Sequence, residues 1–582
     1  MAPGSILGTT SSSAADLLYN ETCPARQSVS VDARFFSEQV IRRTDSTGTH
    51  ALWTIGACVL VVAVSVVTRY QGIGFGLPHT ETRPDEAHVV NLALRIAAGD
   101  PNPHFFIWPT LYIYLVSGLF LGVGALLETF RSQPLSQSDA FLISRSLSAA
   151  FGSASVLVVY WLGVRVGGRR VGLLAAAFLA LALLHVRDSH FGTPDIAMTF
   201  AALLAVSILF GAADWTRLIA GALVAGFAVS IKYNACFVAV VAVWLELHGA
   251  WNGKQLWSRA FWRCVVFGAG MIVGFLIGTP YALLDHRAFL SAIRYILEHT
   301  EQGHAHGAEI LVISEPAWRY ASVVLPAAVG WPLFIAGVIG LIVVAQLRPP
   351  EGFACLLFPS LYFVAAAQGS LVFARYMIPI IPFLCLGAGY FIPMAVGTLR
   401  LRRAAGALTV ILATLVVLPS ALSVIRLNSL LKTPDTRLVA AQWIEQNVSS
   451  TRTVGQNGAR YGRVQLTRFP ESNLWAYDEK ARGFLKNGIP VTGLPDFIVL
   501  QRSPLMLYSR VPGSLQRLLD EHYSAVISFH SGISAATQRD FDQSDAFFLP
   551  LSNLHVMRSP GPDLELYRRT SRTTPTTGET QE

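Results

Sequence analysis

Two adjacent carboxylates, Asp85 and Glu86, lie in residues 83–88, the stretch whose residue types are best suited to acid–base catalysis or metal binding. They follow the first strongly apolar run, residues 51–68, and His88 comes two positions later. Adjacent residues on a helix point about 100° apart, so one carboxylate could accept a proton while the other orients an acceptor or a metal ion. Helix capping is the alternative, because Pro84 suits a first helical turn and acids there complement the helix dipole.

The composition of the whole chain is that of a membrane protein. Of 582 residues, 52% are hydrophobic and only 14% are charged, whereas a soluble domain has about 25% charged residues. Repeated apolar runs of about 20 residues predict a polytopic α-helical membrane protein embedded in a lipid bilayer. The net charge of +8 lies largely in short loops between these runs, where it sets topology, so we expect no nucleic-acid partner. The six cysteines form no CxxC motif and no disulfide framework.

The basic loops indicate how the chain crosses the membrane. Residues 1–50, which contain the pair Arg42-Arg43 near their end, are expected to be a disordered cytoplasmic tail. The span at 51–68 then leads outward. The apolar run 110–127 is short for a span. If it crossed, the basic loop 164–170 would lie outside, against the positive-inside tendency. We therefore interpret 110–127 as an interfacial or re-entrant helix on the external side.

Residues 51–427 form the predicted transmembrane domain, with about eleven spans. One of these is expected to be a long or tilted helix over 320–347. The composition becomes mixed after residue 427, which predicts a small extracytoplasmic α/β domain at 428–570 and a disordered tail at 571–582. The expected elements of this domain are helices at 436–447 and 515–522 and buried strands at 496–500 and 525–529.

Polar residues gather on the outer side of this topology. They include His88, Arg187, Asp188, Asp195, Lys232, His304, His306 and Arg375, with Arg145 inside a span near its outer end. An ionisable residue inside a span is costly and indicates function. Each cation alone could instead reach the interface or pair with a lipid headgroup. The positive-inside tendency would place cations on the cytoplasmic side. Because these cations lie on the outer side together with the carboxylates and histidines, we expect them to form a common site.

Such a set of residues suits the transfer of a group from a lipid phosphate. Cations would bind the phosphate and the charge that develops on it, and a carboxylate would deprotonate the incoming hydroxyl. A carboxylate with histidines could hold a divalent metal of unknown identity. The expected phosphate ligands are Arg145, Lys232 and Arg375. The expected metal ligands are Glu86, His304 and His306.

Over roughly residues 50–425 the chain resembles GT-C fold glycosyltransferases of the protein O-mannosyltransferase and aminoarabinose transferase superfamily, which are glycosyltransferase family 39-like. The order of the motifs carries the resemblance, and no single motif does. The motifs are Pro84-Asp85-Glu86, Arg145 to Gly152, Arg187 to Asp195, Ala228 to Tyr233, Gly303-His304 and Arg375 to Pro382.

The resemblance implies a hexosyl- or pentosyltransferase that takes its sugar from a polyprenyl phosphate. It also implies that Asp85 is the base, that the anomeric centre inverts, and that the acceptor is a glycan, a lipid or a protein. The protein would be integral to the plasma (inner) membrane. His88, Arg187, Asp188 and Asp195 would hold the acceptor or support the residues that touch substrate.

One departure from the family pattern concerns phosphate binding. The aminoarabinose transferases carry Glu-Lys before Pro-Pro after the acidic helix, where this chain has Ile107-Trp108-Pro109-Thr110. Lys232, Arg375 or Arg145 would therefore have to replace that lysine. Two other functions stay open: a transporter or flippase of lipid-linked sugars, and a non-catalytic sugar-binding membrane protein. Intramembrane charges suit a flippase as well, but the sequence shows no clear inverted repeat or broken-helix pair.

Overall fold

The computed structural model describes residues 48–132, 134–211, 214–302, 315–369, 372–399, 403–503, 509, 511–532 and 548–570. The chain divides into two units, Met1–Thr47 and Gly48–Glu582, and every described residue belongs to the second. The tails expected at residues 1–50 and 571–582 therefore lie outside the described residues, apart from the first residues of helix α2.

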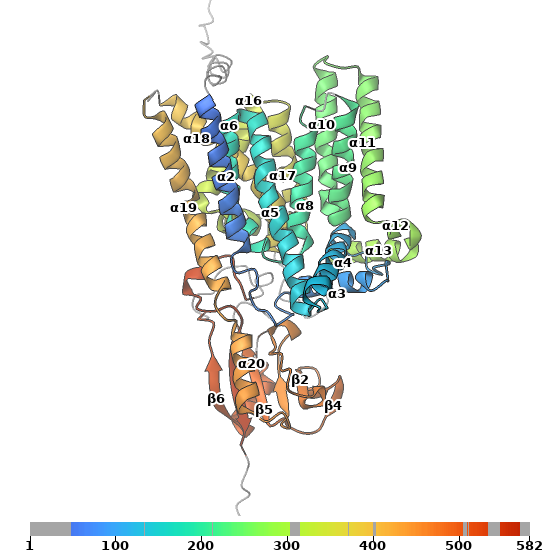
Figure 1. The fold of residues 1–582 in the computed structure, drawn as a ribbon, viewed down its shortest axis with the longest axis vertical. Helices are drawn as coiled ribbons and strands as arrows, with labels where there is room; N and C mark the ends of the chain where they lie inside the picture. Colours follow the sequence, from blue (N-terminus) through green and yellow to red (C-terminus); the bar gives the residue numbers. More distant parts are fainter. Residues whose placement is uncertain are drawn as a thin grey trace, which may run out of the picture. The chain divides into compact units, whose positions relative to one another are not determined.

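Apolar helices account for most of the described chain up to residue 431 (Figure 1). The longer ones are α2 (Gly48–Tyr70), α4 (Leu111–Arg131), α5 (Gln137–Gly167), α6 (Arg169–Ala180), α8 (Pro194–Leu209), α9 (Trp215–Ile231), α10 (Val238–Trp251), α11 (Trp257–Gly278), α16 (Trp331–Leu347), α17 (Glu351–Ala367), α18 (Ile381–Thr398) and α19 (Ala405–Leu431). The connecting elements are α3 (Pro84–Ala97), α7 (Leu183–Asp188), η1 (Tyr233–Phe237), α12 (Tyr281–Leu284), α13 (His286–Gln302), α14 (Pro316–Arg319), η2 (Tyr320–Val324), α15 (Leu325–Val329) and η3 (Ala374–Ile380).

Within the described residues, 7 helices are long and apolar enough to cross a membrane, or up to 8 if one bent pair counts as a single span. Three shorter apolar helices, α8, α9 and α17, accompany them. The structure thus has the predicted polytopic helical architecture, and the predicted count of eleven spans is not confirmed.

The prediction of one continuous helix over 320–347 is wrong. The chain bends by 112° between the segments Pro316–Val329 and Trp331–Leu347. Gly330 lies between them with φ +83°, in the left-handed region that favours glycine. Pro332 then sits in the first turn of α16, where its fixed φ suits a helix start. The backbone requirements at this glycine and proline explain why the helix stops and restarts in another direction.

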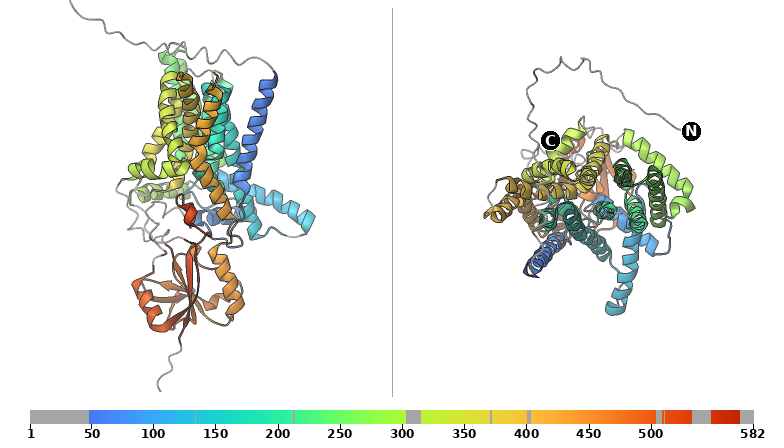
Figure 2. Two further views of the ribbon diagram at one scale, coloured as in Figure 1. Left: turned by 90° about the vertical axis from the view of Figure 1, so that its left-hand side faces the viewer. Right: turned by 90° about the horizontal axis from the view of Figure 1, so that it is seen from above.

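Helix α4, which covers the ambiguous run 110–127, takes an unusual course. Figure 2 shows it projecting sideways from the other helices, across the direction of the long spans. It is nevertheless one of the helices long and apolar enough to cross a membrane. Its sideways direction agrees with the interfacial interpretation, which stays a prediction.

Helix α3 carries the acidic pair and begins as the sequence predicts. Pro84 occupies its first turn together with both acids, where proline and negative charge are favoured. The buried side of the helix includes Glu86, Val89, Val90 and Ala93, at the three- and four-residue spacing of one helical face. Because this face packs against the rest of the protein, Glu86 is buried while Asp85 remains partly exposed.

The C-terminal part of the chain forms a mixed seven-stranded sheet in the order β4-β3-β2-β1-β5-β7-β6. Its strands are β1 (Val454–Gln456), β2 (Leu474–Asp478), β3 (Gly483–Lys486), β4 (Ile489–Val491), β5 (Phe497–Arg502), β6 (Tyr523–Phe529) and β7 (Asp563–Arg569). Strand β1 is parallel to β2 and β5, and the remaining pairs are antiparallel. Helices α20 (Thr436–Asn447) and α21 (Gly513–His522) contribute to separate cores.

Successive side chains of strand β5 point alternately into these two cores. Ile498 and Leu500 join the core that contains α21, while Val499 joins the core that contains α20, as expected for side chains that alternate between the faces of a sheet. The predicted helices at 436–447 and 515–522 and the buried strand at 496–500 are confirmed. The prediction of a buried strand at 525–529 is wrong, because β6 is an edge strand that exposes Ala525 and Val526.

Candidate active site

Four of the charged residues expected in the site form two ion pairs beside one aromatic ring. Asp85 Oδ2 lies 3.3 Å from Arg375 Nη2, and Asp195 Oδ1 lies 2.5 Å from Lys232 Nζ. The ring centre of Tyr376 is 5.1 Å from Lys232 Nζ and 5.8 Å from Arg375 Cζ. Both cations are therefore within cation–π distance of the same tyrosine, which brings two carboxylates and two cations into one site.

Helix ends position these side chains. Asp85 and Asp195 lie in the first turns of α3 and α8, each directly after a proline, where carboxylates complement the helix dipole. Lys232 is the residue that ends α9, with an extended backbone at φ −155°, where a cation is favoured. Arg375 lies in η3, the 3₁₀ segment before α18. The repeated Pro-Asp start is thus the local signal that places both carboxylates.

The four charged groups are largely shielded from solvent, and Asp85 is the most exposed of them. The side chains of Asp85 and Arg375 are 25% and 12% exposed, and those of Asp195 and Lys232 are 5% and 13% exposed. Partial burial strengthens electrostatic interactions relative to bulk water. Because both pairs also adjoin Tyr376, they together form the candidate binding site.

Glu86 and Arg145 form a separate, fully buried pair. Arg145 Nε and Nη2 each donate a 2.8 Å hydrogen bond to one oxygen of Glu86. Arg145 Nη1 donates to the carbonyl oxygens of Ile73 and Phe75, and Nη2 also donates to the hydroxyl of Thr82. All three nitrogens of the guanidinium are therefore engaged, and they hold the loop between α2 and α3.

The expected metal ligands do not form a metal site in the described part of the chain. Glu86 Oε1 accepts a further 2.8 Å hydrogen bond from the amide of Gly192, so both of its oxygens already serve the protein. His304 and His306 lie outside the described residues. Among the residues that the structure describes, no three His, Cys, Asp or Glu side chains are grouped so that they could hold a metal ion. Glu86 in this position does not fit the role of a metal ligand.

Arg187 and Asp188 contact the loop between α2 and α3 through Arg83. Asp188 lies 3.0 Å from Arg187 Nε and 3.5 Å from Arg83 Nη2. The guanidinium of Arg83 stacks on Phe191, 4.1 Å from the ring centre. All three charged side chains are buried, and Arg83 immediately precedes α3. This cluster therefore supports the start of the helix that carries Asp85.

His88 lies on α3 beside aromatic residues. Its ring centre is 4.3 Å from that of Phe105 and 5.8 Å from that of Trp108. Burial lowers the pKa of His88, and the nearby Asp85 carboxylate opposes that shift. This shift favours the neutral form of the imidazole, which lies about one helical turn after Asp85.

Three residues that sequence reasoning did not select have clear roles in this region. Tyr376 follows Arg375 directly in the motif Arg375 to Pro382. An aromatic residue next to a candidate phosphate ligand is the sequence pattern that indicates it. Arg83 adjoins the acidic pair. Arg69, at the end of α2, donates to the carbonyl oxygens of Leu179 and Ala180, and the cost of a cation at a span end was the signal that could have found it.

Comparisons with known proteins agree with the fold. Residues 138–281 match the family model described as dolichyl-phosphate-mannose-protein mannosyltransferase. No curated protein sequence matches the chain. The family match covers the span with Arg145, the Arg187–Asp195 segment and Lys232.

Two solved structures are similar over most of the chain. The oligosaccharyltransferase of Archaeoglobus fulgidus, in its apo form, has a TM-score of 0.53 at 12% identity, covering 90% of each chain. ArnT from Cupriavidus metallidurans, bound to undecaprenyl phosphate, has a TM-score of 0.52 at 14% identity, covering 90% of this chain and 98% of that chain. The protein is an integral membrane protein with the GT-C fold, and its resemblance to GT-C glycosyltransferases is confirmed.

Proposed function

We propose that the protein transfers a sugar from a polyprenyl-phosphate donor to an acceptor hydroxyl on the extracytoplasmic side of the membrane. The observation that carries this proposal is the pairing of Asp85 with Arg375 at 3.3 Å, next to Lys232 and Tyr376, in a GT-C fold. The similar ArnT structure contains undecaprenyl phosphate, which supports a lipid phosphate as the donor's carrier.

Lys232 and Arg375 are the cations best placed to bind the donor phosphate. Both are partly exposed, and each is paired with a carboxylate that a phosphate can displace. Charge-assisted hydrogen bonds from the two cations to the donor phosphate would replace their bonds to the carboxylates. Displacement from Arg375 also releases Asp85, whose carboxylate then becomes available to accept a proton.

The proposed reaction is a single displacement. The acceptor oxygen attacks the anomeric carbon, and the bond from that carbon to the phosphate oxygen breaks. The polyprenyl phosphate leaves with the bonding electrons, and Lys232 and Arg375 stabilise the charge on it. The hydroxyl proton passes to Asp85. Because attack occurs on the face opposite to the leaving group, the anomeric configuration inverts.

Glu86 and Arg145 have a positioning role in this proposal. Their side chains are fully buried and already fully engaged with each other and with the first loop. We infer that they hold the start of α3 so that Asp85 faces the cations. This role replaces the expectation that Arg145 binds the donor phosphate and that Glu86 holds a metal or the acceptor.

The orientation in the membrane follows from the positions of basic residues. The connection between α10 and α11, residues 252–256, contains Lys254 and lies at the end of these helices away from the sheet (Figure 1). Arg169 and Arg170 begin α6. Loops rich in Lys and Arg favour the cytoplasm, so we assign the opposite end, with Asp85 and residues 428–570, to the extracytoplasmic side of the plasma (inner) membrane, and the N-terminus to the cytoplasm.

The test is a transfer assay with purified full-length protein in lipid nanodiscs. A panel of labelled polyprenyl-phosphate hexoses and pentoses is incubated with membrane extracts that supply glycan, lipid and protein acceptors. Released polyprenyl phosphate and labelled product are both measured. We expect release with one donor class and a labelled acceptor in the same sample. No release with any donor would overturn the proposal.

A flippase for lipid-linked sugars is the second candidate, and one observation favours it. The segments Pro316–Val329 and Trp331–Leu347 form a broken helix bent by 112°, and broken helices line substrate sites in transporters. In proteoliposomes, a flippase would move the labelled donor between leaflets without cleaving it. Release of polyprenyl phosphate therefore separates the two functions.

A further inference from the structure

The C-terminal domain contacts the loop that leads into the helix of Asp85. This loop connects α2 to α3, and its residues 79–81 meet residues 460–465, which we call the clamp loop. His79 Nε2 lies 2.8 Å from the carbonyl oxygen of Arg463. Arg460 Nη2 lies 2.8 Å from Glu81 Oε1. Two contacts between segments more than 370 residues apart thus join the domain to the first external loop.

Gln465 adds two hydrogen bonds to the residue between these contacts. Its side-chain oxygen accepts from the amide of Thr80 at 3.2 Å, and its side-chain nitrogen donates to the Thr80 hydroxyl at 3.3 Å. The contact therefore includes both the backbone and the side chain of Thr80. Three consecutive residues of the first loop are held by one short segment of the C-terminal domain.

The clamp loop is itself fixed to the base of its domain. Arg437 pairs with Asp435 through hydrogen bonds of 2.8 and 2.6 Å, and both side chains are buried. Arg437 Nη1 also donates a 2.5 Å hydrogen bond to the carbonyl oxygen of Tyr461. This buried ion pair lies at the start of α20, shortly after α19 ends. The clamp loop is therefore anchored close to the point where the domain leaves the last apolar helix.

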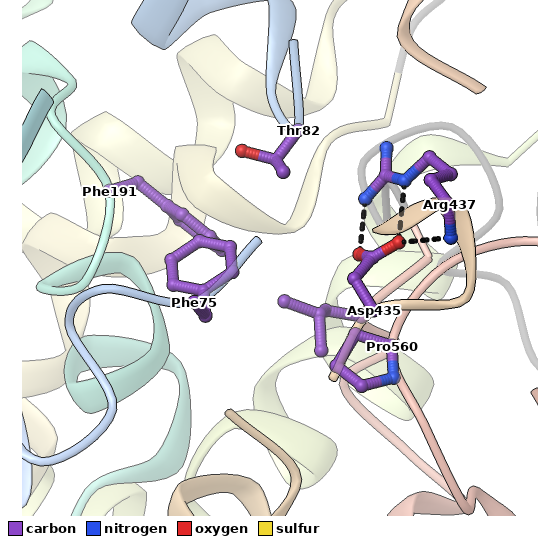
Figure 3. A pocket seen from close by; sticks show the side chains of 7 residues that line it. Phe75, Thr82, Phe191, Asp435, Arg437 and Pro560 are labelled. Atoms are coloured by element: carbon purple, nitrogen blue, oxygen red, sulfur yellow. Dashed lines mark hydrogen bonds and ion pairs between the residues drawn. The ribbon is translucent and has the colours of Figure 1, made fainter. Parts of the chain in front are cut away.

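The first loop is also held from the side of the apolar helices. Arg145 on α5 donates to the carbonyls of Ile73 and Phe75 and to the hydroxyl of Thr82. Figure 3 shows Phe75 and Thr82 on one side of a small pocket and the Asp435–Arg437 pair on the other. The residues just before Asp85 are thus restrained by α5 and by the C-terminal domain at the same time.

We propose that the clamp loop is a positioning element for Asp85. By fixing residues 79–81, it fixes the entry of the chain into α3 and hence the direction of the carboxylate in the first turn. A misplacement of about 1 Å in a catalytic group can cost roughly 100-fold in rate, so a contact of this kind has a large effect without touching substrate. The effect on catalysis rests on the proposed function, whereas the restraint of the loop does not.

The test removes the contacts of Arg460 and Gln465 with the first loop and leaves the His79–Arg463 hydrogen bond and the core in place. Arg460 is 83% exposed, and Gln465 is also exposed, so Arg460→Ala/Gln465→Ala should fold normally. Lys480→Ala, at an exposed cation on the turn between β2 and β3 of the same domain, is the matched control. Hydrogen exchange of residues 79–86 and the steady-state constants for the donor are measured in full-length protein.

We expect exchange at Thr80 and Glu81 to become about tenfold faster in the double variant, because fewer contacts then oppose local opening. We expect kcat to fall about tenfold with little change in KM, since the donor site itself is intact. The control should match the wild type in both. The charge-conserving Arg460→Lys should retain most of the wild-type kcat.

The outcomes separate this inference from the proposed function. Unchanged exchange in the double variant would overturn the clamp, whatever the enzyme's activity. Faster exchange with an unchanged kcat would overturn its positioning role. If the wild type transfers no sugar from any donor, the proposed function fails, and the exchange measurement alone then decides whether the restraint exists.

Discussion

The carboxylate of Glu86 and the guanidinium of Arg145 pair through two 2.8 Å hydrogen bonds in a fully buried position. The neighbouring acid, Asp85, is 25% exposed and faces Arg375 instead. Two adjacent residues of the same charge therefore have different surroundings, because they point to different sides of α3. The buried acid is held by Arg145, and the partly exposed acid is paired with Arg375.

Replacing Glu86 with glutamine is expected to destabilise the protein strongly. The substitution leaves the buried Arg145 without a counter-charge, and breaking a buried ion pair in this way costs about 3–5 kcal/mol. Thermal unfolding in detergent, followed by tryptophan fluorescence, should show a clear fall in Tm. Glu86→Gln/Arg145→Met removes both charges and should recover part of that loss. A wild-type Tm for Glu86→Gln would contradict the anchoring role.

Asp85→Asn is expected to give a folded protein with transfer reduced roughly 100-fold or more, because asparagine cannot accept the proton. Asparagine caps a helix about as well as aspartate, so a purely capping role predicts near-normal transfer. Turnover at saturating donor distinguishes the two roles. Asp139→Asn, at the capping acid of α5, is the matched control and should stay active. Wild-type turnover in Asp85→Asn would exclude Asp85 as the base.

Neutralising either cation of the site is expected to weaken donor binding. Loss of a charge-assisted hydrogen bond costs about 1.5–3 kcal/mol, or roughly 10- to 100-fold in affinity. The Kd of polyprenyl phosphate should therefore rise in Lys232→Gln and in Arg375→Gln, measured by equilibrium binding in nanodiscs. Lys254→Gln changes a cation at the other end of the helices and should bind normally. Equal affinity in all three variants would remove these residues from the phosphate site.

Stability is expected to depend on pH through His79. Burial, followed by the charge of Arg437, lowers the pKa of His79 to about 4. Its Nδ1 accepts a hydrogen bond from the amide of Glu81, which requires the neutral ring. The unfolded chain has a histidine pKa of about 6.5, so between about pH 6.5 and pH 4 it binds more protons than the folded chain.

The resulting stability is fully present above about pH 6.5 and is lost as the pH falls towards 4, by about 3 kcal/mol. Unfolding free energies measured across this range should fall more steeply in the wild type than in His79→Gln. His555→Gln, at an exposed histidine of the same part of the chain, should follow the wild type. Identical slopes for wild type and His79→Gln would show that His79 does not titrate in this way.

The sequence alone determined the features that depend on local pattern. Apolar runs predicted a polytopic helical protein, because a membrane span needs about 20 apolar residues and little else. Periodicity placed α20 at 436–447, the same bounds that the structure has. The Pro-Asp starts of α3 and α8 are also local, since proline at a first turn and a carboxylate near the helix dipole act within a few residues.

Only the tertiary structure decided which charges pair. The sequence places Arg145 near the outer end of a span. Whether its guanidinium pairs with Glu86 or binds a ligand depends on how α5 packs against the first loop. Lys232 meets Asp195 from another helix for the same reason. The exposed edge of β6 and the clamp on Glu81 likewise depend on which segments lie side by side. Pairing between distant segments follows from packing of the whole chain, and short-range sequence patterns contain no information about it.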